Sequence, residues 1–181
     1  IGGRLVEAVF YEWQYYSAHP WAIPAYWLGG MATHGLLLGG IAGILIFCRI
    51  HRQPFLVTAD ALAVPAALEM GFGRLGNFID GQIVGSLTDV WWGVKFPDAE
   101  GFRHPVVLYD AIKNFLLVPL LLVVYRLKLR PGAVTGLFLF AYAGLRIPVD
   151  LFRVYPTTLL GLATGQFLNI AMSLGGRILL A

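Results

Sequence analysis

The stretch WLGGMATHGLLLGGIAGILIF, residues 27–47, decides the fold class, because it contains no aspartate, glutamate, lysine or arginine. A transmembrane helix needs about 20 predominantly apolar residues to cross the hydrocarbon core of a bilayer. The whole chain of 181 residues is similarly apolar, with 58% hydrophobic residues, 13% charged residues and a mean hydropathy of +0.72. Soluble domains contain about twice this share of charged residues. The sequence therefore predicts an all-α, polytopic membrane protein built as a helix bundle.

Four further segments have the apolar composition of membrane spans. They are Phe55–Phe72, Val106–Tyr125, Ala133–Phe152 and Leu159–Leu180. Together with an amphipathic start at Ile1–Tyr16, they predict about five spans plus a partial first helix, in one transmembrane domain over residues 1–181. The start shows neither a methionine nor the pattern of a signal peptide, so we interpret the chain as the remainder of a longer protein.

Two short connections between the expected spans are basic: one contains Arg49, His51 and Arg52, and the other contains Arg126, Lys128 and Arg130. The positive-inside rule places such connections in the cytoplasm. Because successive spans alternate in direction, the long connection from about residue 73 to residue 105 is then expected on the outer side of the membrane.

Charge and cysteine content exclude several classes of protein. The formal net charge is only +3 and the basic residues are dispersed, so nothing indicates a nucleic-acid surface. The single cysteine, Cys48, excludes an intrachain disulfide and offers no metal-ligand spacing. We therefore expect no nucleic-acid partner and no metal site.

Polar residues of the expected spans gather near the outer level of the membrane. Four of them follow one another at spacings of four, four and three in the fourth span, which places them on one helical face. Charged residues within spans usually face a bundle interior or a wet cavity, so we expect a lipid-accessible polar pocket at this level. Its candidate residues are His34, Arg74, Asn77, His104, Tyr109, Asp110, Tyr142, Arg146, Asp150 and Arg153.

Several arginines beside an apolar cavity suit an anionic lipid headgroup. One guanidinium group can donate to two oxygens of a phosphate at once, and it stays charged when partly desolvated. The glycines at 71, 73 and 76 are expected to let the backbone turn tightly and approach a phosphate. A phosphate held in this way can be recognised or can become a leaving group. The second case requires a base, for which His34 and His104 are the candidates.

Each of these residues also has a structural interpretation. Arg146 could serve an ion pair with Asp150, and Arg153 could extend its charged end to the interface. The histidine of the first span could be a hydrogen-bonded packing residue. Asp110 and Lys113, three residues apart, are expected to neutralise each other.

The stretch GRLGNFIDGQIVG, residues 73–85, resembles the signature of the prolipoprotein diacylglyceryl transferase family, which reads G-R-x-G-N-F-x-N-x-E-x-x-G. The resemblance extends over nearly the whole chain, and the N-terminal spans of the family would precede Ile1. The flanking blocks that carry it are GGRLVEAVFY, GGMATHGLLLGG, RHPVVLYD, RPGAVTGLFLFAYAGLRIPVDLFR and GQFLNIAM.

The resemblance implies a reaction in the bacterial cytoplasmic (inner) membrane, with the active site facing outward. Members of the family transfer the diacylglyceryl group of phosphatidylglycerol to the lipobox cysteine thiol of a prolipoprotein signal peptide, forming a thioether and releasing glycerol phosphate. The implied partners are phosphatidylglycerol, the signal peptide and membrane lipids, and no cofactor is implied.

The resemblance implies that the essential arginine and asparagine of the signature fall on Arg74 and Asn77, a tyrosine and a second arginine on Tyr142 and Arg146, and a histidine on His34. Arg74 and Arg146 are expected to hold the phosphate, Asn77 and Tyr142 to orient the substrates, and His34 or His104 to deprotonate the thiol. The expected catalytic set is His34, Arg74, Asn77, Tyr142 and Arg146. The expected substrate-binding set is Arg74, Arg146, Arg153, His104, Asp80 and Gly85.

The chain departs from the signature at two positions, with Asp80 and Gln82 where the family has asparagine and glutamate. These departures keep an alternative open, namely a catalytically altered paralogue that serves as a lipid-binding structural subunit of a membrane complex. A small transporter is a third class. It is disfavoured because the polar residues collect at one depth and do not line a full path.

Overall fold

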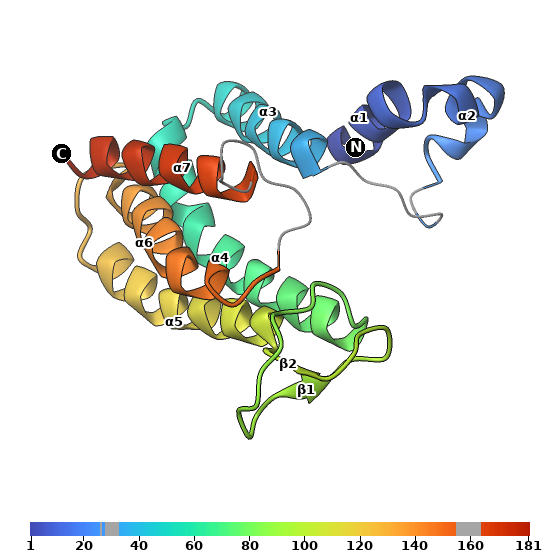
Figure 1. Ribbon diagram of the computed structural model, residues 1–181. Helices are drawn as coiled ribbons and strands as arrows, with labels where there is room; N and C mark the ends of the chain where they lie inside the picture. The colour runs from blue at the N-terminus through green and yellow to red at the C-terminus, as the bar shows by residue number, and fades with distance from the viewer. Residues whose placement is uncertain (26, 28–32, 155–163) are drawn as a thin grey trace. The chain divides into compact units, whose positions relative to one another are not determined.

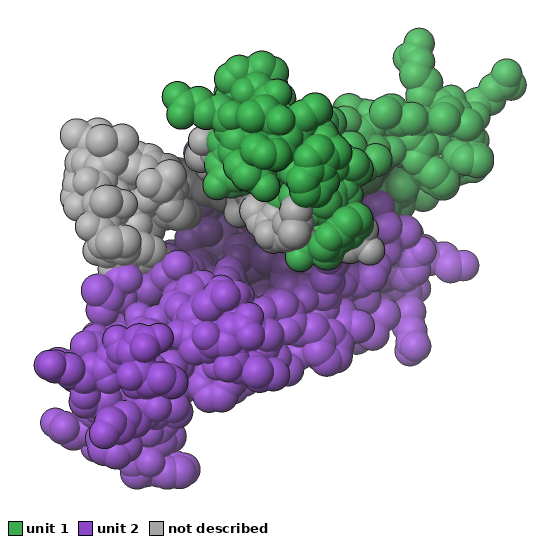
Figure 2. Space-filling view, turned by 90° about the vertical axis from the view of Figure 1, so that its right-hand side faces the viewer, with its two compact units in different colours: residues 1–58 green, residues 59–181 purple. Residues whose placement is uncertain are grey.

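The computed structural model of the chain describes residues 1–25, 27, 33–154 and 164–181. It is mostly helical, with one small two-stranded sheet among the described residues, which confirms the predicted helical membrane protein (Figure 1). The chain divides into two compact units, residues 1–58 and 59–181 (Figure 2). The expectation of a single domain stays a prediction.

Three of the helices described are long and apolar enough to cross a membrane. They are α4 (Phe55–Ile79), α5 (Val106–Arg126) and α6 (Ala133–Asp150). The other two expected spans correspond to α3 (Thr33–His51) and α7 (Thr164–Leu180). Residues 28–32 and 159–163 of those expected spans lie outside the described residues, so the count of five stays a prediction.

The first unit contains short helical segments followed by α3. These segments are α1 (Gly2–Val6), the π-helix η1 (Glu7–Tyr11), α2 (Trp13–Ala18) and the 3-10 helix η2 (Pro20–Ala22). Glycines let α1 pack directly against α3, because a Cβ atom at Gly39 would lie 2.9 Å from the Cα atom of Gly2. The buried guanidinium of Arg4 donates hydrogen bonds of 2.9 Å to the carbonyls of Ala22 and Ala25. Arg4 therefore holds the chain that follows η2.

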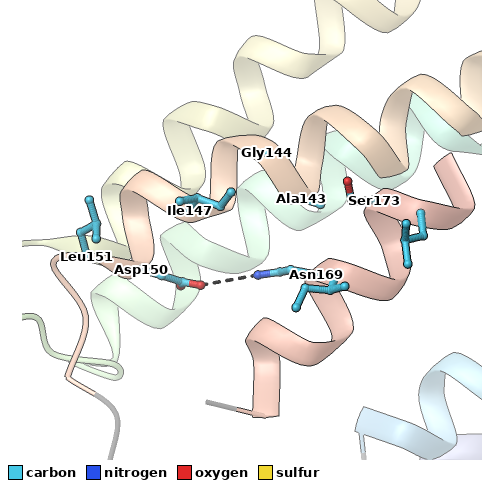
Figure 3. A pocket seen from close by; sticks show the side chains of 9 residues that line it. Ala143, Gly144, Ile147, Asp150, Leu151, Asn169 and Ser173 are labelled. Atoms are coloured by element: carbon cyan, nitrogen blue, oxygen red, sulfur yellow. Dashed lines mark hydrogen bonds between the residues drawn. The ribbon is translucent and has the colours of Figure 1, made fainter. Parts of the chain in front are cut away.

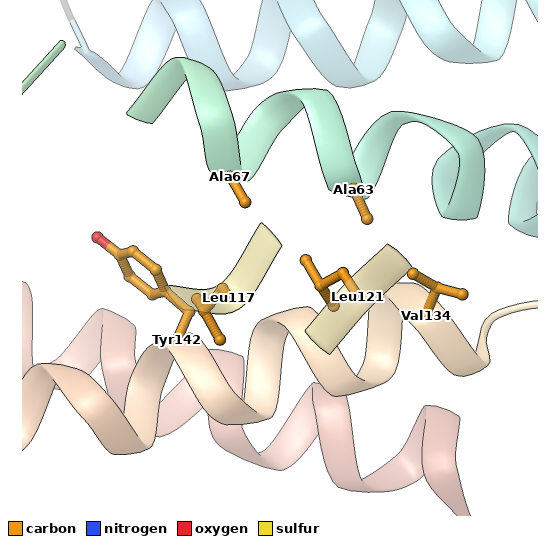
Figure 4. Packing of buried hydrophobic residues seen from close by; sticks show 6 residues of the cluster. All are labelled: Ala63, Ala67, Leu117, Leu121, Val134 and Tyr142. Atoms are coloured by element: carbon orange, nitrogen blue, oxygen red, sulfur yellow. The ribbon is translucent and has the colours of Figure 1, made fainter. Parts of the chain in front are cut away.

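The core of the second unit lies between α4, α5 and α6. Small side chains on α4 face larger ones on the other two helices, and the larger side chains fill the space between the helices. Figure 4 shows the six buried residues of this cluster: Ala63 and Ala67 of α4, Leu117 and Leu121 of α5, and Val134 and Tyr142 of α6.

Helix α4 continues to Ile79, so the expectation that the span ends at Phe72 and is followed by a tight turn is wrong. Gly71 is needed for helix packing, because a Cβ atom there would lie 2.5 Å from the ring of Phe115 on α5. The glycines at 73 and 76 are also helical. Arg74 and Asn77 are therefore carried on the last turns of a helix, where their side-chain directions are set by its geometry.

Asp60 of α4 holds the N-terminus of α6. Its buried carboxylate accepts hydrogen bonds from the backbone N–H groups of Gly132 at 2.7 Å and Thr135 at 2.8 Å, and from the Thr135 hydroxyl at 2.6 Å. The free N–H groups at a helix N-terminus carry a partial positive charge, so a carboxylate satisfies both their hydrogen bonding and their charge. This charge within a span is therefore structural.

Helix α7 packs along α6, and two glycines mark the closest approach. A Cβ atom at Gly176 of α7 would lie 2.7 Å from the carbonyl oxygen of Gly136 and 2.7 Å from the backbone nitrogen of Phe140, both on α6. Small residues commonly allow membrane helices to approach in this way. The contact lies near the start of α6 and the end of α7.

The segment between α4 and α5 folds against the end of the bundle where α5 begins and α6 ends, which we call the loop end. Its strands β1 (Val94–Lys95) and β2 (Phe102–Arg103) are antiparallel. The backbone N–H of Ser86 donates to the carbonyl of Phe152 at 2.9 Å, and that of His104 donates to Ser86 at 3.0 Å. These bonds fix the segment to the residues that follow α6.

Candidate functional site

A buried carboxylate on α5, Asp110, joins cations from three helices at the loop end. Arg74 Nε of α4 lies 2.9 Å from Asp110 Oδ2, and Arg146 Nη1 of α6 donates to the same oxygen. Lys113 Nζ, on α5 itself, lies 3.1 Å from Oδ1. The expected pairing of Asp110 with Lys113 is confirmed, and Asp110 also brings the two predicted phosphate-binding arginines together.

A second carboxylate, Asp150, completes the ionic cluster. Its Oδ1 accepts a hydrogen bond of 2.8 Å from Arg146 Nε, which is the ion pair named as the structural interpretation of Arg146. Its Oδ2 lies 3.5 Å from Asn169 Nδ2 of α7 (Figure 3). The ionic cluster is Arg74, Asp110, Lys113, Arg146 and Asp150. Three cations against two carboxylates leave it with one net positive charge.

Tyr142 contacts the same cluster through Lys113. The ammonium of Lys113 lies 3.6 Å from the centroid of the Tyr142 ring, a distance at which a cation is attracted by the ring face. Lys113 also donates a hydrogen bond of 3.0 Å to the fully buried Asn114. Lys113 is therefore held from three sides, and the predicted site residue Tyr142 lies beside the ionic cluster through its ring.

Arg74 is the cation of the cluster whose terminal guanidinium nitrogens are available to donate hydrogen bonds to a ligand. Its side chain is 23% exposed, against 8% for Arg146. Its contact with Asp110 uses Nε, and within the described residues its two terminal nitrogens have no protein partner. Because these nitrogens form one side of the guanidinium fork, Arg74 can donate to two oxygens of an anion while it keeps its ion pair.

A small cavity of about 10 Å³ adjoins Arg74, Asp110, Arg146 and Arg153. It holds about one water-sized sphere, so a phosphate needs more room than it offers. Ile83 also lines this cavity and has a backbone φ of 59°. A β-branched residue in the left-handed region is strained, and such strain collects at functional sites. Displacing Ile83 would enlarge the space beside three arginines.

Two further signature residues, Asn77 and Gln82, contact each other and not the ionic cluster. Asn77 Nδ2 donates to Gln82 Oε1 at 2.9 Å, and Gln82 donates its backbone N–H to the Asn77 carbonyl at 2.8 Å. Asp80 is exposed. A Cβ atom at Gly85 would collide with the carbonyl oxygen of His104, so the described role of Gly85 is close packing.

The two candidate bases differ in what the structure describes. His104 is half-buried, its Nδ1 lies 3.0 Å from the hydroxyl of Tyr109, and its ring centroid lies 4.6 Å from that of Phe152. Trp92 Nε1 donates to the same hydroxyl at 2.7 Å. His34 belongs to α3, and its side chain lies outside the described part of the chain.

Fold and site together define a class, a polytopic helical membrane protein with a net positive, partly buried ionic cluster at one end of its bundle. Such a site suits an anionic headgroup at the level of the membrane surface. The family model described as prolipoprotein diacylglyceryl transferase matches residues 1–181. The chain belongs to this family.

Curated relatives support the assignment over nearly the whole chain. A phosphatidylglycerol–prolipoprotein diacylglyceryl transferase of Nitrosomonas europaea is 40% identical over 99% of this chain and 67% of its own length. Proteins of the same name from Nitrosospira multiformis and Geobacter sulfurreducens are 39% and 41% identical, over 99% and 92% of this chain and 65% of their own lengths. The chain thus spans about two thirds of the length of these relatives.

Sequence reasoning missed the connections that Asp110 and Asn169 make. The spacing of Asp110 and Lys113 indicated a pair within α5, but the contacts to Arg74 and Arg146 depend on how three helices pack. Asn169 stands in the block GQFLNIAM that contributed to the resemblance, and nothing in that block indicated a contact with Asp150.

Proposed function

We propose that this chain transfers the diacylglyceryl group of phosphatidylglycerol to the lipobox cysteine of prolipoproteins, the reaction for which its curated relatives are named. The observation that carries the proposal is the convergence of Arg74 and Arg146, from two helices, on one buried carboxylate in a net positive cluster. The spare donors of Arg74 are the atoms that would bind the lipid phosphate first.

In this reaction the cysteine sulfur attacks the glyceryl carbon that carries the phosphate. A sulfur–carbon bond forms, the carbon–oxygen bond to phosphate breaks, and the electron pair stays on the released glycerol phosphate. Arg74 and Arg146 stabilise the negative charge that develops on the leaving group, which is usually the largest contribution to such catalysis. Arg153 beside the small cavity supplies a further positive charge.

The thiol must lose its proton before or during the attack. A free thiol with a pKa of about 8.5 is mostly neutral at pH 7, so a base or a strong positive field has to raise the thiolate fraction. In our proposal either His34 or His104 accepts this proton, while Asn77 and Tyr142 orient the substrates. The hydroxyl of Tyr109 would fix the ring orientation of His104.

The proposed location is the cytoplasmic membrane of a bacterium, with the loop end facing outward. The basic connections at Arg49–Arg52 and Arg126–Arg130 support this orientation by the positive-inside rule. The lipid and the peptide would then reach the site from the outer leaflet.

The full-length protein in vesicles of phosphatidylglycerol should add a diacylglyceryl group to the cysteine of a lipobox peptide, as measured by mass spectrometry. Arg74→Lys should raise the KM for phosphatidylglycerol about tenfold, because a lysine can pair with Asp110 but lacks the guanidinium fork. Arg49→Lys, in a basic connection, is the matched control. If the protein binds phosphatidylglycerol but transfers nothing, under conditions in which a curated relative is active, the alternative of a lipid-binding structural subunit would be favoured.

A further inference from the structure

Two adjacent tryptophans stand exposed in the turn before β1. Trp91 is 89% exposed and Trp92 is 45% exposed, and their ring centroids lie 5.3 Å apart in an edge-to-face arrangement. The backbone N–H of Gly93 donates to the carbonyl of Val90 at 2.9 Å and closes the turn. We call residues 90–93 the tryptophan turn. A pair of large rings left this exposed is typical of a contact surface.

One of the two rings is hydrogen-bonded to the apolar face of α5. Trp92 Nε1 donates at 2.7 Å to the hydroxyl of Tyr109, in the first turn of that helix. Four exposed apolar residues follow Tyr109 on the same helical face, at spacings of three or four residues: Ile112, Leu116, Leu120 and Val123. Because α5 is long and apolar enough to cross a membrane, this face is the surface that it offers to hydrocarbon. The tryptophan turn therefore continues the lipid-facing surface of a span.

The length of α5 gives the depth of this contact. Arg126 stands in the last turn of α5, and its charge belongs at the level of the headgroups on the far side of the bilayer. The helix from Tyr109 to Arg126 is roughly 26 Å long, while the hydrocarbon core is about 30 Å thick. Tyr109 thus lies close to the other boundary of the hydrocarbon. Tryptophan and tyrosine are enriched at this level, because each combines an apolar ring with a polar hydrogen.

The segment that carries the tryptophan turn is fixed to the bundle on both sides of the turn. Before it, the backbone N–H of Ser86 donates to the carbonyl of Phe152, at the end of α6. After it, the buried ring of Phe96 packs edge-on against Phe78 of α4, with centroids 6.0 Å apart. The depth of the tryptophan turn is therefore set by the spans.

We propose that the tryptophan turn is a membrane-interface anchor, with the Trp91 ring inserted between the headgroups and the acyl chains on the loop-end side of the bilayer. Residues 90–93 carry no charge, so their partner is the lipid surface in general and no particular headgroup. The indole N–H of Trp91 would donate to phosphate or ester oxygens while its ring displaces water. This anchor goes beyond the proposed transfer reaction and does not depend on it.

Spin-label accessibility measures this depth without turnover. A nitroxide is attached at Trp91→Cys, in a full-length protein otherwise free of cysteine and reconstituted in phosphatidylcholine vesicles. Oxygen concentrates in hydrocarbon and a nickel chelate stays in water, so the ratio of their collision rates with the label reports depth. Asp98→Cys, an exposed and charged position of the same segment, is the water-facing control. Ile112→Cys, on the exposed face of α5, is the hydrocarbon reference.

We expect the oxygen-to-nickel ratio at position 91 to be severalfold above that at position 98 and below that at position 112. Equal ratios at positions 91 and 98 would overturn the proposal. Protection of the label at position 91 that requires a lipobox peptide, or a high protein-to-lipid ratio, would assign the turn to a peptide or to a second copy of the chain.

Two further outcomes are decisive. A label at position 112 that is shielded from both reagents would show that protein covers this face of α5, which would also overturn the proposal. The expected order of depths in a protein that transfers nothing would support the anchor and overturn only the enzymatic function.

Discussion

At the scale of single residues, Asp110 determines whether the cations of the cluster can coexist. Asp110→Asn removes one negative charge and leaves Arg74, Lys113 and Arg146 close together with reduced compensation. Breaking a buried ion pair by removing one partner costs about 3–5 kcal/mol, so we expect a clearly lower melting temperature in detergent. Asp98→Asn, at an exposed position, is the control. Equal melting temperatures for the two variants would contradict this role.

A second residue-scale prediction concerns Ile83, which lines the small cavity in a strained backbone conformation. Ile83→Gly removes the side chain and fits a positive φ, so a lipid phosphate would need to displace less. We expect a severalfold lower KM for phosphatidylglycerol with a smaller change in kcat. Ile83→Val, which stays β-branched, should behave like the unaltered protein. An unchanged KM for Ile83→Gly would show that this segment does not cover the phosphate site.

Helical spacing offered the ion pair of Arg146 with Asp150 as the structural alternative to a phosphate-binding role, and the structure contains that pair, because residues four apart on a helix are neighbours. The contact between Arg74 and Asp110 joins residues on different helices, and no spacing within one helix reveals it. Sequence therefore indicated which residues are unusual for a membrane, and the packing of three helices decided which of them meet.

At the scale of elements, the start of α6 depends on a carboxylate from α4. Asp60→Ala removes three hydrogen bonds at once, two of them from backbone N–H groups at the helix start. Losing such a cap typically costs about 0.5–2 kcal/mol, and a buried acceptor for several donors lies at the upper end. In thermal unfolding, the melting temperature of Asp60→Ala should be lower than that of Thr135→Val, which removes only the hydrogen bond of the hydroxyl group. The reverse order would contradict the capping role.

The extent of α4 shows where sequence reasoning about elements failed. Two glycines and two polar residues between Phe72 and Ile79 are typical of a turn, yet the helix continues to Ile79. Gly71 is required by the ring of Phe115, and Arg74 has its partner inside the bundle, so tertiary packing outweighs the weak helix propensity of glycine. The existence and type of α4, α5 and α6 were predictable from their apolar runs, but this boundary was not.

At the scale of the whole molecule, the orientation in the membrane can be tested directly. In a Cys48→Ala background, Asp98→Cys should react with an impermeant thiol reagent in intact cells, because the segment before α5 is expected outside. Lys128→Cys, in a basic connection, should react only after permeabilisation. Cys48 is the single cysteine among these 181 residues, so its replacement removes their contribution to the background. Labelling with the opposite preference would invert the orientation.

The shared carboxylate of Asp110 also has a consequence for how this protein can change over generations. Arg74, Lys113 and Arg146 come from three helices, but each is tolerated in the membrane because the same side chain faces it. A substitution at any one of these positions changes the charge balance of the cluster, and therefore changes which side chains are tolerated at the other positions. A lineage that lost Asp110 would have to replace several cations almost together, so drift at these four positions should be slow and correlated.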